Sequence, residues 1–349
     1  MRGIPVKKRL LGISNWLRRE FSSQAIILLY HRVVELPSDP LLLSVGPQHF
    51  AEHLEILRKY CCPISLKDLV KAKEKKSIPP KGVVITFDDG YADNLYEVKP
   101  LLERFGIPAT AFIITGYAGG ERFFWWDELE RLFLQPGKLP PGLSLDLYSA
   151  LGHGDLGADV NYSEEDFRQY RHWNLLDKAD PTLRQRLYRA AYEILSSLAG
   201  KQQQELWDRL LLWAGLNSSG QSAHRPLSEE ELLRLQEGGL IEVGAHTVTH
   251  PVLSRVSADL EREEIQKSKT FLEERLGHAV NSFAYPYGSK TDYTRQSVAL
   301  VEEAGFHCAC ANFPEAVWPE SSVFELPRLV VRDWDGEEFL KHLRLWLSL

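Results

Sequence analysis

The chain has 349 residues, enough for one large or two ordinary domains and for a core that folds without disulfide or metal staples. Hydrophobic residues make up 44% and charged residues 26%, which excludes a largely disordered chain. The formal net charge is −7. We therefore expect no nucleic-acid partner, because binding many phosphates requires a clustered basic face.

The first predicted element, residues 1–24, is basic and amphipathic. Six lysines and arginines stand against one glutamate, a net charge of +5, and Leu10, Ile13, Leu17 and Phe21 recur at helical spacing. Such a segment either contacts an anionic membrane surface peripherally or packs on the body as a terminal helix. The sequence shows neither a signal peptide nor an apolar run near the ~20 residues of a membrane span. We expect a cytoplasmic protein, with peripheral membrane association through residues 1–24 as the alternative.

Short apolar runs then alternate with longer helical patterns. The predicted strands are residues 26–30, 83–87, 109–114, 240–245, 280–285, 306–311 and 326–331, with a weaker one at 63–66. The predicted helices between them are residues 47–60, 94–105, 258–276, 293–304 and 337–347. This alternation predicts an α/β fold with parallel strands and crossover helices, and about seven strands suit a distorted (β/α) barrel.

One stretch, residues 117–226, breaks the alternation because it contains no convincing buried strand. Its length is too great for a plain loop, and residues 181–198 and 202–214 have helical patterns. We predict a helical insertion at 117–226, with the barrel formed by residues 25–116 and 227–349.

Paired polar residues follow two of the predicted strands. Asp88 and Asp89 lie directly after residues 83–87, and His246 and His250 lie after residues 240–245. Adjacent buried carboxylates require a compensating cation or proton, and two imidazoles four residues apart can bind one divalent ion. Taken singly, the Asp88-Asp89 pair is also typical of an ordinary turn, and the two histidines could simply be buried side chains of the core.

Two further clusters have the same placement, His31 after residues 26–30 and Tyr285-Pro286-Tyr287 after residues 280–284. Residues beyond the carboxyl ends of barrel strands converge on one face, where the chemistry of such barrels is found. Structural turns would be scattered over both faces. The four clusters together therefore predict one active site.

These motifs, T-F-D-D-G at 86–90 and H-T-V-T-H-P at 246–251, resemble those of the polysaccharide deacetylases of carbohydrate esterase family 4, the NodB homology fold. The resemblance covers residues 25–116 and 227–335 and implies a distorted (β/α) barrel. By motif, Asp88 would be the catalytic base, and Asp89, His246 and His250 would hold a divalent ion, with zinc the expected one.

The family's R-x-P-Y motif reads Ala284-Tyr285-Pro286-Tyr287 here. The resemblance implies that the backbone N–H of Tyr287 stabilises the oxyanion. The arginine that braces the catalytic aspartate in the family is replaced by Ala284, and Arg328 and Arg332 are candidates to take its place. The family's late L-x-H histidine motif has no match.

A histidine motif of this kind, Leu28-Leu29-Tyr30-His31, lies near the N-terminus instead. This placement resembles the circularly permuted deacetylases of exopolysaccharide systems. It implies that His31 is the general acid, whereas a strand-end histidine bonded to the backbone is the structural alternative. Tyr91 and Tyr287 are candidates to stack on sugar rings, and we expect Trp125 and Trp126 mainly to anchor the insertion.

The resemblance therefore implies a metal-dependent enzyme that removes N-acetyl groups from the amino sugars of a glycan or glycan precursor. Two alternatives remain at this point. One is hydrolysis of another non-peptide C–N bond, in an imide or formamide, at the same site. The other is a catalytically silent carbohydrate-binding barrel, which the missing arginine at position 284 favours.

Overall fold

A computed structural model describes residues 24–119, 123–140, 161–215 and 225–348. The predicted basic helix, apart from Gln24, lies outside these residues. Seven parallel strands follow the spatial order β11-β10-β9-β6-β5-β1-β12. Their bounds are β1 Ala25–Tyr30, β5 Gly82–Phe87, β6 Ala109–Ile113, β9 Ile241–Ala245, β10 Ser282–Ala284, β11 Cys308–Cys310 and β12 Leu329–Val330.

The sheet curls so that its two ends approach each other. A parallel bridge joins Cys310 at the end of β11 to Leu326, three residues before β12. The short strand β4 (Cys62–Pro63) adds to the start of β5. The predicted distorted (β/α) barrel of about seven strands is thus confirmed, with β10, β11 and β12 shorter than the sequence pattern indicated.

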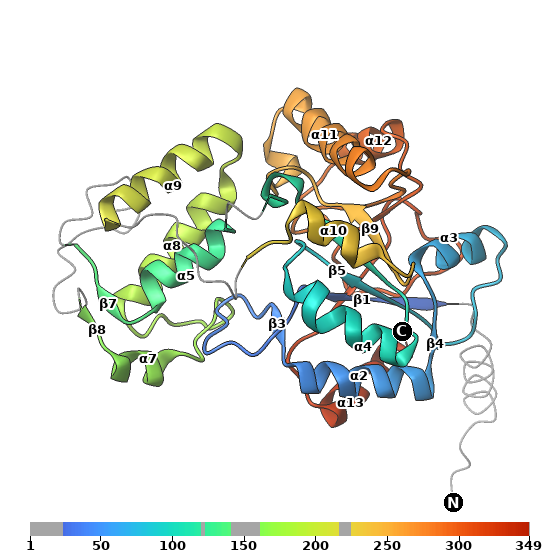
Figure 1. The fold of residues 1–349 in the computed structure, drawn as a ribbon, viewed down its shortest axis with the longest axis horizontal. Coiled ribbons are helices and arrows are strands. Elements are labelled where there is room, and N and C mark those ends of the chain that lie inside the picture. The colour runs from blue at the N-terminus through green and yellow to red at the C-terminus, as the bar shows by residue number, and fades with distance from the viewer. Residues whose placement is uncertain (1–23, 120–122, 141–160, 216–224, 349) are drawn as a thin grey trace, which may run out of the picture.

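Helices cover the outside of the curled sheet and its amino-terminal end (Figure 1). They are α2 Pro47–Tyr60, α3 Leu66–Glu74, α4 Lys99–Phe105, α10 Glu229–Gln236, α11 Ala258–Leu276, α12 Arg295–Glu303 and α13 Gly336–Trp346. A π-helical turn, Asn94–Val98, precedes α4, and short 3₁₀ turns lie at Thr115–Tyr117 and Leu253–Arg255. The strand pair β2 (Arg32–Val33) and β3 (Ser44–Val45) extends the loop after β1.

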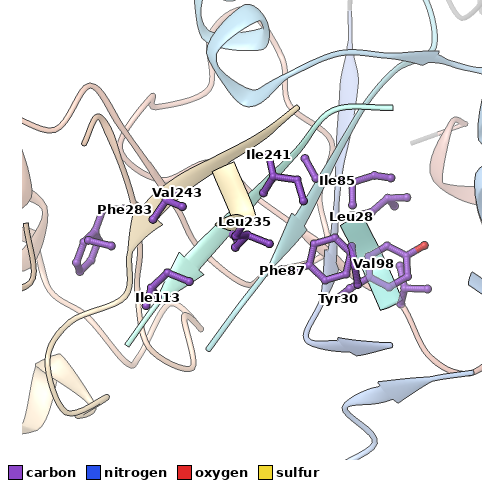
Figure 2. Close-up of a cluster of buried hydrophobic side chains, with 14 of the residues drawn as sticks. Leu28, Tyr30, Ile85, Phe87, Val98, Ile113, Leu235, Ile241, Val243 and Phe283 are labelled. Atoms are coloured by element: carbon purple, nitrogen blue, oxygen red, sulfur yellow. The ribbon is translucent and has the colours of Figure 1, made fainter. Parts of the chain in front are cut away.

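Alternating strand residues build two apolar layers, as expected for strands buried on both faces. Leu28, Tyr30, Ile85 and Phe87 pack outward against the helices (Figure 2). The intervening residues, among them Ile27, Val84 and Phe112, fill the inside of the barrel. There they meet Leu66, Leu69 and Val70 of α3, which close the amino-terminal end of the barrel. The carboxyl ends of the strands are left for the polar clusters.

Between β6 and β9 the described residues form α5 Trp125–Leu134, α7 Glu164–Tyr170, α8 Leu183–Ser197, α9 Gly200–Ala214 and the small pair β7 Gly137–Lys138 and β8 Asn161–Tyr162. Helices α5, α8 and α9 share an apolar cluster of their own. They lie together beside the barrel (Figure 1). No helix in the described parts of the chain is long and apolar enough to cross a membrane.

Candidate active site

The four predicted clusters meet in one pocket at the carboxyl ends of the strands. The pocket has a volume of ≈ 200 Å³. Its lining comprises His31, Leu41, Leu43, Asp88, Asp89, Trp126, Tyr192, His246, His250, Tyr287, Asn312, Val330 and Arg332. All six predicted site residues belong to it.

Asp88 is held by an arginine from the far end of the chain. Arg328 Nη1 and Nη2 each donate to one carboxylate oxygen of Asp88 at 2.7 Å. Arg328 Nε donates to the Ala311 carbonyl at 2.9 Å, which fixes the plane of the guanidinium. Burial alone would raise the pKa of Asp88, but the charge and hydrogen bonds of Arg328 outweigh it and lower the pKa to about 2. Asp88 is therefore ionised at neutral pH, and Arg328 occupies the bracing role that the sequence at Ala284 leaves open.

Asp89, His246 and His250 form a compact set of donors. Nε2 of each histidine lies 3.7 Å from Asp89 Oδ1, and one donor atom from each of the three residues lies within 4.8 Å of the others. His246 Nδ1 lies 2.7 Å from the Ala284 carbonyl, so this nitrogen carries the proton and Nε2 presents a lone pair. Burial lowers the pKa of both histidines, which keeps them neutral. Neutral imidazole and carboxylate are donors that fit a divalent ion.

The loop between the two histidines is fixed by Glu264 of α11. Its Oε2 accepts hydrogen bonds from Val248 N and Thr249 N at 2.8 Å, and its Oε1 accepts from Thr249 Oγ1 at 2.7 Å. On the other side Gly116 N donates to the Val248 carbonyl at 2.8 Å. A Cβ at Gly116 would collide with that carbonyl, so the close approach requires glycine.

Backbone strain is concentrated in this pocket. Of the seven non-glycine residues with positive φ in the described parts of the chain, four lie at this site: Asp89 (72°), Thr247 (64°), His250 (61°) and Tyr287 (58°). Such conformations cost free energy and cluster at functional sites, where surrounding contacts enforce them. One such contact runs from His250 N to Thr247 Oγ1 at 3.0 Å.

Tyr287 borders the donor set from the turn after β10. Its ring lies 4.8 Å from that of His250, centroid to centroid. Asn312 Nδ2 donates to the Tyr287 carbonyl at 3.1 Å, while the Tyr287 N–H has no acceptor among the described residues. An N–H in this position can donate to a developing oxyanion.

His31 lies one residue beyond β1, and its ring has no hydrogen-bond partner within the described ranges. Asn94 Nδ2 holds its backbone carbonyl at 3.0 Å. Burial lowers the pKa of His31 to about 4; the charge of Asp88 opposes this shift, and those of Arg328 and Arg332 add to it. The resting imidazole is therefore neutral, with its proton available for a hydrogen bond into the pocket.

The apolar walls come from loop 34–43 and from the helices between β6 and β9. Trp126 of α5 lies 5.3 Å from His250 between ring centroids and stacks on Phe124, so it lines the pocket as well as anchoring α5. Tyr192 of α8 adds a second aromatic wall. The expectation that Tyr91 stacks on a sugar is wrong: its ring is buried, and Arg32 covers it at 4.2 Å.

The sequence reasoning missed Glu264 and Tyr192. Glu264 lies within a long charged helix pattern, where nothing distinguishes a buried glutamate from an exposed one. Tyr192 lies on a helix outside the barrel, so no strand-end rule points to it.

Comparison with known proteins agrees with this fold. The family model described as polysaccharide deacetylase matches residues 75–136 and 171–309, more than half of the chain. The chain belongs to the polysaccharide deacetylase family. Among curated relatives, it is 27% identical over 133 residues to the putative polysaccharide deacetylase YxkH of Bacillus subtilis, covering 38% of this chain and 46% of that protein.

A second relative is the poly-beta-1,6-N-acetyl-D-glucosamine N-deacetylase of Staphylococcus epidermidis, 34% identical over 116 residues, or 29% of this chain and 39% of that protein. The matches thus span less than half the length of these relatives. Among solved structures, the Streptococcus pyogenes deacetylase PplD has a TM-score of 0.55 at 16% identity over 92% of this chain and 98% of that one. IcaB from Ammonifex degensii has a TM-score of 0.55 at 17% identity over 93% and 97%. These two similarities show the shared fold.

Proposed function

We propose that this protein hydrolyses the N-acetyl group of an amino sugar in a glycan or glycan precursor, using a divalent ion held by Asp89, His246 and His250. The observation that carries the proposal is the placement of an ionised Asp88, braced by Arg328, beside those three donors. The curated relative from Staphylococcus epidermidis, named as an N-deacetylase, supports this chemistry.

The reaction adds water across the amide and yields acetate and a free amine. When bound, a divalent ion such as zinc lowers the pKa of a water molecule and polarises the amide carbonyl. Asp88 then takes the proton from the attacking water, because its pKa of about 2 keeps it ionised and Arg328 keeps it oriented.

Two further groups that line the pocket complete the proposed mechanism. The Tyr287 N–H donates to the oxyanion of the tetrahedral intermediate, a contact of the kind that contributes about 3–4 kcal/mol. His31 protonates the departing nitrogen, without which the intermediate would return to the amide. Because its pKa at rest is about 4, His31 receives this proton from solvent as negative charge develops in the pocket, and Asp88 returns to solvent the proton that it took from the water. In this proposal the chain is of the permuted type, with its acid on the first strand.

The bracing contact of Arg328 weighs against a catalytically silent barrel, since that reading rested on the missing arginine at position 284. The alternative, hydrolysis of an imide or formamide, is distinguished from N-deacetylation by whether acetate is released. Purified protein supplied with zinc or cobalt is incubated with N-acetylglucosamine oligomers, and acetate is measured. Acetate release supports the proposal. Activity on formamide or imide substrates without acetate release from the oligomers would contradict it.

A further inference from the structure

Three arginines lie close to the pocket, and carboxylates neutralise two of them. Arg328 is paired with Asp88 at 2.7 Å, and Arg32 Nε with Asp93 Oδ2 at 3.1 Å. In both cases burial disfavours the charge, yet the carboxylate raises the pKa of the arginine above its ordinary value. These two positive charges are therefore compensated within the protein.

The third arginine, Arg332, has no carboxylate within ion-pair distance among the described residues. It is half-buried in the pocket wall, and its Nη1 donates to the Leu42 carbonyl. The acid whose charge acts on it, Asp39, accepts hydrogen bonds from Leu43 N at 3.0 Å and Ser44 N at 2.7 Å. Burial accordingly lowers the pKa of Arg332, opposite to the other two arginines, although a guanidinium remains charged at neutral pH.

The strand register places Arg332 next to the proposed general acid. Strands β1 and β12 are parallel, with Leu29 opposite Val330, so two residues further along His31 and Arg332 leave the sheet side by side. Both line the pocket. A sugar whose acetamido nitrogen faces His31 therefore brings its neighbouring substituents towards Arg332.

We propose that Arg332 binds an acidic group of the substrate, so that the site prefers N-acetylated amino sugars carrying a phosphate or carboxylate beside the acetylated residue. This inference rests on the proposed function and specifies its substrate class. A guanidinium presents five N–H donors in a planar fork that matches both anions. One of these donors is used by Leu42, which leaves the rest of the fork for a ligand.

The alternative is that Arg332 only holds loop 34–43 through the Leu42 carbonyl. A loop-holding role would affect all substrates equally, whereas an anion site affects the acidic ones. The ratio of kcat/KM for an acidic substrate to that for its neutral counterpart therefore distinguishes the two roles.

The experiment compares three N-acetylglucosamine oligosaccharides of equal length: a neutral one, one with a phosphate monoester, and one with a uronic acid neighbour. We expect the wild-type protein to favour at least one acidic substrate by about tenfold or more, as charge-assisted hydrogen bonds imply. Arg332→Gln should remove this preference, and Arg332→Lys should retain part of it. Preference for the phosphate alone indicates a sugar phosphate, and preference for both indicates a general anion site.

Arg262→Gln is the matched control, because Arg262 is an exposed arginine paired with Glu303 at 2.9 Å, away from the pocket. It should leave the ratio unchanged. A wild-type ratio near one, or an equal loss on all three substrates in Arg332→Gln, overturns the inference.

A binding measurement separates this inference from the proposed function. N-acetylglucosamine 1-phosphate is titrated calorimetrically into the metal-loaded wild-type and Arg332→Gln proteins. Weaker binding to the variant, with no acetate released from any oligosaccharide, contradicts the proposed function but supports the anion site. Equal binding to both proteins contradicts the anion site, whatever the turnover.

Discussion

Arg328 and Asp88 form a bidentate ion pair inside the barrel, with both N–O distances 2.7 Å and a separation of 240 positions in the sequence. Arg328 is 1% exposed and Asp88 3% exposed. The pair explains how the site keeps an ionised carboxylate in a buried position although Ala284 stands where the family has its arginine. It also makes the charge and orientation of Asp88 depend on one residue far away in the sequence.

Replacing this arginine should therefore damage both folding and catalysis. Arg328→Met leaves Asp88 buried without a counter-charge, which should lower the free energy of unfolding by about 3–5 kcal/mol. Urea denaturation of the variant checks this value. Because Asp88 then loses its orientation and low pKa, acetate release should also fall by two orders of magnitude or more, on the order expected for loss of a general base.

The double variant Arg328→Met/Asp88→Asn serves as the control for that prediction. Removing the stranded carboxylate should recover part of the lost stability, since the two sites are coupled. If the stability losses of Arg328→Met and Asp88→Asn instead simply add up in the double variant, the two side chains are not coupled. That result would show that the ion pair does not hold Asp88.

Glu264 should govern metal affinity although it does not touch the pocket. Glu264→Gln replaces an acceptor that orders Val248 and Thr249, between the two histidines. Loss of such an outer contact typically weakens metal binding about 10–100-fold. Competition with a chromogenic chelator measures the affinity. Glu263→Gln, which changes the adjacent exposed glutamate paired with Lys267, should leave it unchanged. Equal affinities in the two variants would refute the positioning role.

Stability should decrease as the pH rises from weakly acidic to weakly basic values. Burial, aided by the neighbouring charge of Asp127 and opposed by a hydrogen bond from Ser38, raises the pKa of Glu130 from 4.5 to about 8. A raised folded-state pKa stabilises the protein fully below the unfolded pKa, and this contribution is lost as pH rises through the folded pKa. The window is therefore pH 4.5 to about 8.

The test of this window is Glu130→Gln, which retains an oxygen acceptor for Ser38 and cannot ionise. Unfolding free energies measured at intervals across the window should fall more steeply in the wild-type protein, by on the order of 1 kcal/mol per pH unit. Parallel curves for the two proteins would mean that folding does not raise the pKa of Glu130.

The local part of the site could be predicted from sequence because each motif directly follows a strand. Asp88 and Asp89 follow β5, and His246 and His250 follow β9, so knowing the strands is enough to bring them together. The catalytic and ligand roles of these residues, and the insertion limits 117–226, remain predictions.

The rest of the site could not be predicted, because it depends on which residues the folded chain brings together. The sequence proposed Arg328 and Arg332 as equal candidates for the brace, and only the barrel's closure decides that Arg328 meets Asp88. Tyr91 follows the same motif as Asp89, yet its ring turns under Arg32 and away from the pocket. The spacing of residues in the sequence does not by itself predict where a side chain points at a strained turn.

The most direct test of the proposed metal-dependent site is the metal content of two purified aspartate variants, measured by mass spectrometry beside the wild-type protein. Asp88→Asn should retain about one divalent ion per chain but release no acetate, because it keeps the donor set and loses the base. Asp89→Ala should lose both the ion and the activity. Full metal content in Asp89→Ala, or loss of the metal in a folded Asp88→Asn, would contradict the assignment of these two neighbouring carboxylates.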